Sequence, residues 1–127
     1  MAGIGISDGN VVFSRAAGES LASDQFKLVK VDTDAGIDLC DATTDFPIGV
    51  LLNDPAAGEA CEILHSGRGK VKIGGTVTAG QLLGPDAAGL AIAVTADTKT
   101  YCAIALESGV ANDVIEAAIV PVSHIAG

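Results

Sequence analysis

The chain has 127 residues, 49 % of them hydrophobic, with sixteen glycines, one Tyr and no Trp. This length favours one domain, and a core of Val, Ile, Leu and Ala favours thin regular layers over an aromatic-lined pocket. The formal net charge of −9 argues against a nucleic-acid binder, because phosphate contacts require a basic surface.

The N-terminal segment, residues 1–20, is expected to form an extended arm that leads into a first strand. It has no basic stretch followed by an apolar core, so it does not match a signal peptide. The whole chain has no run of 18 apolar residues, and no membrane-spanning helix is expected. We therefore expect a cytoplasm-like site of synthesis and no contact with a membrane.

Short apolar or alternating segments between glycine-rich turns predict a mainly β chain with little helix. The expected strands lie near Val11–Ser14, Phe26–Val31, Ile37–Cys40, Ile48–Leu52, Ala60–His65, Arg68–Ile73, Gln81–Leu83, Ala91–Val94, Tyr101–Leu106 and Val114–Val122. The last of these is apolar on both faces, which predicts cover on both sides, by the core and by a neighbouring subunit.

The strand Arg68–Ile73 carries three of the seven basic residues. Alternation places Arg68, Lys70 and Lys72 on one face and apolar or glycine residues on the other. Two interpretations remain open for this stripe. It could protect a sheet edge from unwanted pairing, or it could dock on an acidic partner surface.

Part of the sequence occurs twice. Leu52, Ala57, Glu59 and Glu62 correspond to Leu106, Ala111, Asp113 and Glu116 at a constant offset of 54 residues. Farther back, Gln25 aligns with Gln81 and Phe26 with Leu82, after a two-residue difference in length. The predicted units are about 21–67 and 76–122, within one β domain spanning 21–127. The basic strand 68–74 is expected to connect them. Each unit alone is too thin to close a core, so one pseudo-twofold barrel or sandwich is expected.

Residues with catalytic or metal-binding potential do not form a recognisable site. The glycine-rich stretch Gly3–Gly9 lacks the strand and helix that a nucleotide-binding loop needs. The acidic residues of Asp32–Asp41 do not have the spacing of a calcium loop. His65 and His124 are interpreted as surface or turn residues. Three widely spaced cysteines, Cys40, Cys61 and Cys102, are interpreted as buried free thiols. We expect no enzyme activity and no cofactor.

Two stretches carry a resemblance to a known family. They are ISDGNVVFSRAAGESLASDQFKLV near the N-terminus and PIGVLLNDPAAGEACEILHSGRGKVKIGGTVTAGQLLGPDAAG in the middle of the chain. They resemble the decoration, or cement, proteins of tailed-bacteriophage capsids. The likeness covers nearly the whole chain and consists of Gly/Ala patterns without a chemical group. The segment ANDVIEAAIVP departs from the family's usual glycine turn.

The resemblance implies a structural protein on the outside of the virion, assembled in the host cytoplasm, that binds the major capsid protein and stabilises the head. It implies self-association, with a trimer favoured and a dimer as the alternative. It also implies that the N-terminal arm lies on the capsid. The arm's implied contact residues are Ile4, Ile6, Val11, Val12 and Phe13.

Three other functions stay open. A carbohydrate-binding or surface-binding β module on a virion would need aromatic platforms, and Tyr101 would have to carry the stacking alone. A self-assembling shell or fibre component would form large oligomers by itself. An enzyme is the third alternative.

Overall fold

The structure, a computed structural model, describes residues 9–95 and 100–124. These residues form a mainly β fold, which confirms the fold class predicted from the sequence, and they contain no α-helix. The strands are β2 (Val11–Ala16), β3 (Leu28–Val31), β4 (Ile37–Leu39), β5 (Gly49–Leu51), β6 (Ala60–Lys72), β7 (Leu82–Pro85), β8 (Ala91–Ala93), β9 (Thr100–Ala105) and β10 (Val114–His124).

The longest strand, β6, joins two strands that the sequence predicts as separate. Its first half pairs with β5 and β2, and its second half pairs with β10. Gly67 lies between the halves with a φ of 126°, a value that side chains rarely tolerate. The glycine that signals a turn in the sequence therefore lies inside a continuous strand, at the point where its pairing partners change.

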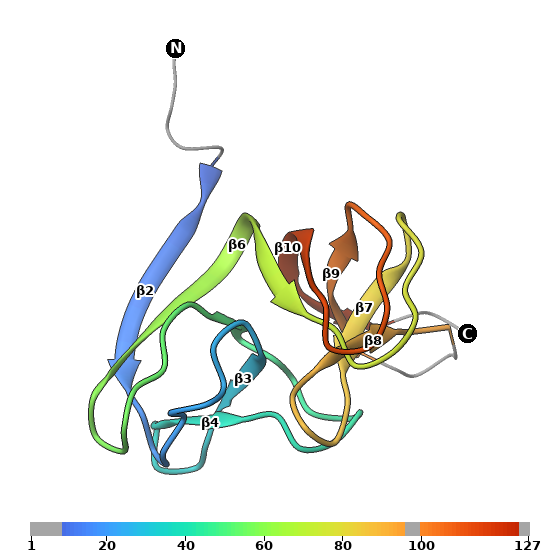
Figure 1. The fold of residues 1–127 in the computed structure, drawn as a ribbon. Coiled ribbons are helices and arrows are strands. Elements are labelled where there is room, and N and C mark those ends of the chain that lie inside the picture. Colours follow the sequence, from blue (N-terminus) through green and yellow to red (C-terminus); the bar gives the residue numbers. More distant parts are fainter. Residues whose placement is uncertain (1–8, 96–99, 125–127) are drawn as a thin grey trace.

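The strands form two barrel-like units that share β6 (Figure 1). The first unit has the pairing order β4-β3-β5-β6-β2, and the second has the order β8-β7-β9-β10-β6. A parallel bridge closes each unit, between Ala17 and Ile37 in the first and between Ile73 and Ala91 in the second. Two small barrels therefore stand side by side, and each unit closes around buried residues of its own, which the sequence analysis did not expect.

Backbone hydrogen bonds recur in the two units at the offset seen in the sequence. The Leu52 N–H donates to the Glu62 carbonyl at 2.8 Å, and the Leu106 N–H donates to the Glu116 carbonyl at 3.0 Å. The turn residues Gly58 and Asn112 also correspond, with φ values of 84° and 73°. Asparagine is one of the few residues that adopt this conformation readily, which explains the exchange.

The structure corrects one part of the sequence alignment. Phe26 corresponds to Gly80, not to Leu82, and Gln81 corresponds to Lys27, not to Gln25, because the N–H groups of Lys27 and Gln81 donate to Asp24 and Thr78. The N–H groups of Phe26 and Gly80 donate to Leu51 and Ala105, and both residues have positive φ. The alignment matched two apolar residues, whereas the fold matches two backbone conformations.

The repeated unit includes the strand that precedes it. The Ala17 N–H donates to Glu59 at 2.8 Å, and the Ile73 N–H donates to Asp113 at 2.9 Å. In the first unit β2 therefore has the place that the second half of β6 has in the second unit. The repeat is therefore longer than the sequence comparison indicates. Its first strand is β2 in the first unit and the basic second half of β6 in the second unit.

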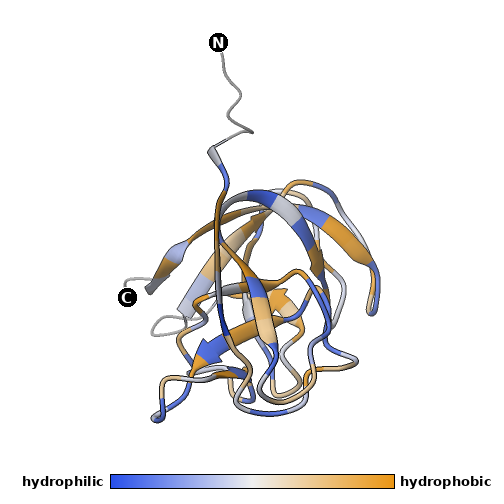
Figure 2. Cartoon of the chain, turned by 90° about the vertical axis from the view of Figure 1, so that its left-hand side faces the viewer, coloured by the Kyte–Doolittle hydropathy of each residue, from blue (hydrophilic) through white to orange (hydrophobic). Residues whose placement is uncertain are grey.

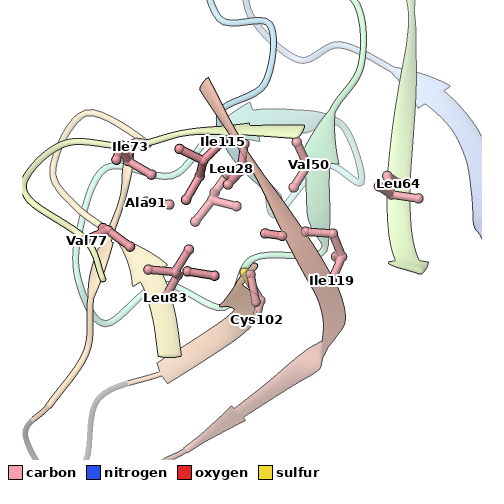
Figure 3. Packing of buried hydrophobic residues seen from close by; sticks show 14 of the residues in the cluster. Leu28, Val50, Leu64, Ile73, Val77, Leu83, Ala91, Cys102, Ile115 and Ile119 are labelled. Carbon is pink, nitrogen blue, oxygen red and sulfur yellow. The ribbon is translucent and has the colours of Figure 1, made fainter. Parts of the chain in front are cut away.

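The buried residues form two clusters of unequal size. The smaller one fills the first unit with Ala17, Leu21, Val29, Ile37, Leu51, Cys61 and Ile63. The larger cluster holds the seven equivalent residues of the second unit, Ile73, Val77, Leu83, Ala91, Ala105, Ile115 and Ala117. It also holds eight residues that join the units: Leu28, Cys40, Val50 and Leu64 from the first, and Val71, Cys102, Ala103 and Ile119 from the second (Figure 3).

Candidate interaction surfaces on β2 and β6

The strand β2 places part of the predicted contact arm at the surface. Val11 and Val12 are 49 % and 46 % exposed. Phe13 packs against the smaller cluster, and its ring lies edge-on to His65 with 6.1 Å between centroids. Ile4 and Ile6 lie outside the described residues. Among the described strands β2 pairs only with β6, so its outer edge offers free backbone groups to a partner strand.

The face that carries β2 mixes hydrophobic and hydrophilic residues (Figure 2). The basic residues of β6 alternate with buried ones as the sequence predicts. Arg68 and Lys70 are exposed and Lys72 is half-buried, while Val71 is fully buried. Glu116 on β10 pairs with Lys70 in the backbone register and lies 3.4 Å from the Arg68 guanidinium, between Oε2 and Nε. The stripe is thus partly neutralised at one end. Its docking role remains a prediction.

Asn10 joins the arm to the basic strand. Its Oδ1 accepts a hydrogen bond from the Arg68 N–H at 2.8 Å, and its Nδ2 donates to the Arg68 carbonyl at 3.2 Å. The side-chain amide therefore continues the β2–β6 ladder past the bulge between Val11 and Val12. This fixes the start of β2 beside the basic part of β6, a contact that the sequence alone does not indicate.

The acidic segment between β3 and β5 is held by hydrogen bonds within the first unit. Lys30 lies 2.9 Å from Asp41 and 3.1 Å from Asp45. The hydrogen bond to Asp41 raises the pKa of Lys30, although burial opposes it. Burial acts to raise the pKa of Asp45, but hydrogen bonds from the Asp41 backbone and from Lys30 outweigh it and lower this pKa. Residues 9–95 and 100–124 contain no group of three His, Cys, Asp or Glu side chains placed to hold a metal ion.

The negative charge of Asp38 on β4 is poorly stabilised by its surroundings. Its Oδ1 is buried and has no hydrogen-bond partner. Burial raises the pKa of Asp38, and the nearby charges of Glu19 and Asp32 raise it further, while Lys30 acts in the opposite direction. Gly18 packs against both Asp32 and Asp38, and a methyl group there would collide with their carboxylates.

We expect Asp38→Asn to stabilise the protein at pH 7 by about 1 kcal/mol, because it removes a poorly solvated charge. The folded state raises the pKa of Asp38, so it binds this proton more tightly than the unfolded chain does. The wild-type stability due to Asp38 is therefore highest at acidic pH and falls as the pH rises through the raised pKa. Urea unfolding should show the gain at pH 7 and little gain in acid, where Asp38 is protonated.

Asp34→Asn is the matched control, because Asp34 is exposed in the neighbouring turn. It should change the free energy of unfolding by less than about 0.5 kcal/mol at either pH. A loss of stability in Asp38→Asn at pH 7 would contradict the interpretation, since it would mean that the charged form makes a favourable contact.

The three cysteines are buried and unpaired, which confirms their interpretation as free thiols. Burial raises the pKa of all three thiols, and it raises that of Cys102 to about 12. His65 also has a structural partner, because its Nδ1 lies 2.8 Å from the Ile48 carbonyl. The side chain of His124 lies outside the described residues.

Two hollows of the described surface are small. One of about 120 Å³ is lined by Thr43, Pro85, Ile92–Thr95 and Thr100. Another of about 290 Å³ includes Phe26, Asp54 and Lys72 in its lining. Sites for small ligands usually measure roughly 300–1,000 Å³, so the exposed strands are the better candidates for function. In the described part of the chain, no helix is long and apolar enough to cross a membrane.

Comparison with known proteins yields a fold relative but no sequence relative. No protein-family model and no curated protein sequence matches the chain. The crystal structure of the head fiber gp8.5 N base in bacteriophage phi29 has a similar fold, with a TM-score of 0.68. The similarity covers 87 % of this chain and 93 % of that one at 17 % sequence identity. Both chains therefore share the two-unit β architecture over almost their full lengths.

Proposed function

We propose that this chain is a structural protein of a tailed-phage head that binds the outside of the assembled capsid and stabilises it. The full-length fold likeness to a phage head-fiber base is the observation that carries the proposal. The family resemblance of the sequence points in the same direction. The proposed partner is the major capsid protein, and the proposed location is the virion exterior.

The surface made by β2 and the middle of β6 is the proposed capsid contact. The exposed Val11 and Val12 supply apolar area, and the free outer edge of β2 can add to a strand of the capsid protein. Lys70 and Lys72 supply positive charge on a chain of net charge −9, which favours an acidic surface on the partner. Phe13 contributes less, because it packs against its own core.

Substitutions at two equally exposed valines, one inside and one outside the proposed surface, test the capsid contact. Val12 on β2 is 46 % exposed, and Val31 at the end of β3 is 47 % exposed. Val12→Asp should weaken co-sedimentation with emptied heads of the phage that encodes the chain, by roughly tenfold or more. Val31→Asp should bind as the wild type does. Equal binding of all three proteins would place the contact elsewhere.

A second experiment tests whether the bound protein stabilises the phage head. Heads carrying the protein should burst at a higher temperature than bare heads, because each bound copy adds contacts that only the intact lattice can make. Binding without a higher burst temperature would support a second function, the base of a projecting fibre, which the phi29 likeness favours. An absence of binding to heads would contradict both functions.

A further inference from the structure

The two units of one chain meet through different faces. The first unit contributes Leu28, Cys40, Val50 and Leu64 to the shared core, and we name these positions the head face. The second unit contributes Val71, Cys102, Ala103 and Ile119, which we name the tail face. In the first unit the tail-face positions correspond to Arg15, Ile48, Gly49 and His65. The two faces consist of different positions of the repeated unit, so the contact is head-to-tail. It leaves the tail face of the first unit and the head face of the second unit without a partner inside the chain.

The unused head face lies on the second unit. It consists of Leu82, Val94, Ile104 and Ala118, the counterparts of the four head-face residues of the first unit. Leu28, Cys40 and Val50 are fully buried and Leu64 is 2 % exposed, whereas all four counterparts are partly exposed. Equivalent apolar positions are thus covered in one unit and open in the other.

We propose that a second copy of this chain covers this open head face with the tail face of its own first unit. The contact between copies would repeat the contact inside each chain. This inference follows from the internal contact, and it does not depend on a role in a phage head.

The sizes of facing side chains support this partner. Inside the chain Gly69 faces Leu64, since a methyl group on Gly69 would lie 2.5 Å from the Leu64 Cδ2. The counterpart positions hold Phe13 and Ala118, so the large and small residues change places. Gly89 similarly packs against the Leu39 side chain, and its counterpart pair is Ala35 and Ala93. The first pair thus places a large residue opposite a small one, although Phe13 also packs against its own core. The second pair places two small residues opposite each other, where the internal contact has a glycine and a leucine.

Backbone groups support it as well. Among the described residues, two backbone-to-backbone hydrogen bonds cross between the units, from the Leu28 N–H to Gly89 at 2.8 Å and from the Lys72 N–H to Phe26 at 2.9 Å. The counterpart of the first would join the Leu82 N–H to the Ala35 carbonyl of the second copy. That carbonyl accepts hydrogen bonds from the Arg15 guanidinium, the shorter at 2.9 Å, so docking requires Arg15 to turn aside.

A head-to-tail contact cannot close between two units. It continues from copy to copy until a ring closes or a filament grows. The purified protein, without capsids, should therefore form assemblies larger than a monomer, and their mass by light scattering should rise with concentration until the ring is complete.

Blocking each face separately tests this arrangement. Ile104→Glu puts a charge on the open head face, and Ala35→Glu puts one on the tail face at an exposed turn. Each variant alone should remain monomeric at concentrations where the wild type assembles. Val110→Asp is the control, because Val110 is 58 % exposed and its counterpart Ala56 is also exposed. It should assemble as the wild type does.

Mixing the two blocked variants gives the decisive result. Each retains the face that the other lacks, so an equimolar mixture should form a one-to-one dimer and nothing larger. If Ile104→Glu does not fold, Ala118→Glu blocks the same face at a smaller residue. A monomeric wild type, or a mixture of folded variants that stays monomeric, would overturn the proposal.

Discussion

Replacement of Leu64 by alanine is expected to lower the free energy of unfolding by about 3 kcal/mol, because it empties a fully packed position. Leu64 is 2 % exposed on β6 and belongs to the cluster that joins the two units. Figure 3 labels it with Val50 and Ile119 among the residues of this cluster. For a chain of this length the loss corresponds to a melting temperature roughly 10–15 °C lower.

Leu106→Ala is the control for this prediction. Leu106 is a leucine of the second unit that is 45 % exposed, so its truncation should cost less than about 1 kcal/mol. Denaturant unfolding of both variants gives the comparison. If Leu64→Ala were as stable as Leu106→Ala, the two units would not share a packed core, and the internal contact could not serve as the template for a contact between copies.

The strands were predictable because their signals are local. Apolar segments between glycine turns place strands by alternation alone, and every expected segment overlaps a strand of the structure. The correspondence of Gly58 with Asn112 was predictable for the same reason, since few residue types accept a positive φ. Turn chemistry and alternation depend on a few neighbouring residues, and the sequence displays those directly.

Two features were not predictable: the continuity of β6, and the correspondence of Phe26 with Gly80 in the repeat. A glycine marks a turn in most contexts, yet Gly67 lies inside a strand because β10 pairs with the residues that follow it. Phe26 adopts a positive φ of 70°, which is rare for a bulky side chain, so its sequence gives no indication that it replaces a glycine. Both features depend on pairing with distant strands.

The candidate surface was predicted in part. Alternation correctly placed Arg68 and Lys70 on one exposed face of a strand. The neighbouring Glu116 and the bridging Asn10 were missed, because their positions depend on the register between β6, β10 and β2. An asparagine just before a strand has many local uses, and no pattern in the sequence indicates that this one reaches across to Arg68.

Gly67→Ala is expected to destabilise the protein by about 2–3 kcal/mol, because the new side chain would be strained and crowded. Its φ is 126°, and a Cβ there would collide with the Asn10 side chain and lie 2.7 Å from the Asn10 Cα. Asn10 would have to leave Arg68, and the start of β2 would separate from β6. Urea unfolding measures the loss, and trypsin should cut faster after Arg15 once β2 is released.

Gly75→Ala separates this effect from the general cost of replacing a glycine. A Cβ on Gly75 would meet no atom within 4 Å, and its φ is not positive, so that variant should unfold within about 0.5 kcal/mol of the wild type. If the Asn10 bridge holds β2 in place, Gly67→Ala should also lose binding to phage heads under conditions where most of it is folded. A Gly67→Ala protein with unchanged stability and slow cleavage at Arg15 would show that β2 is held by its ladder to β6 alone.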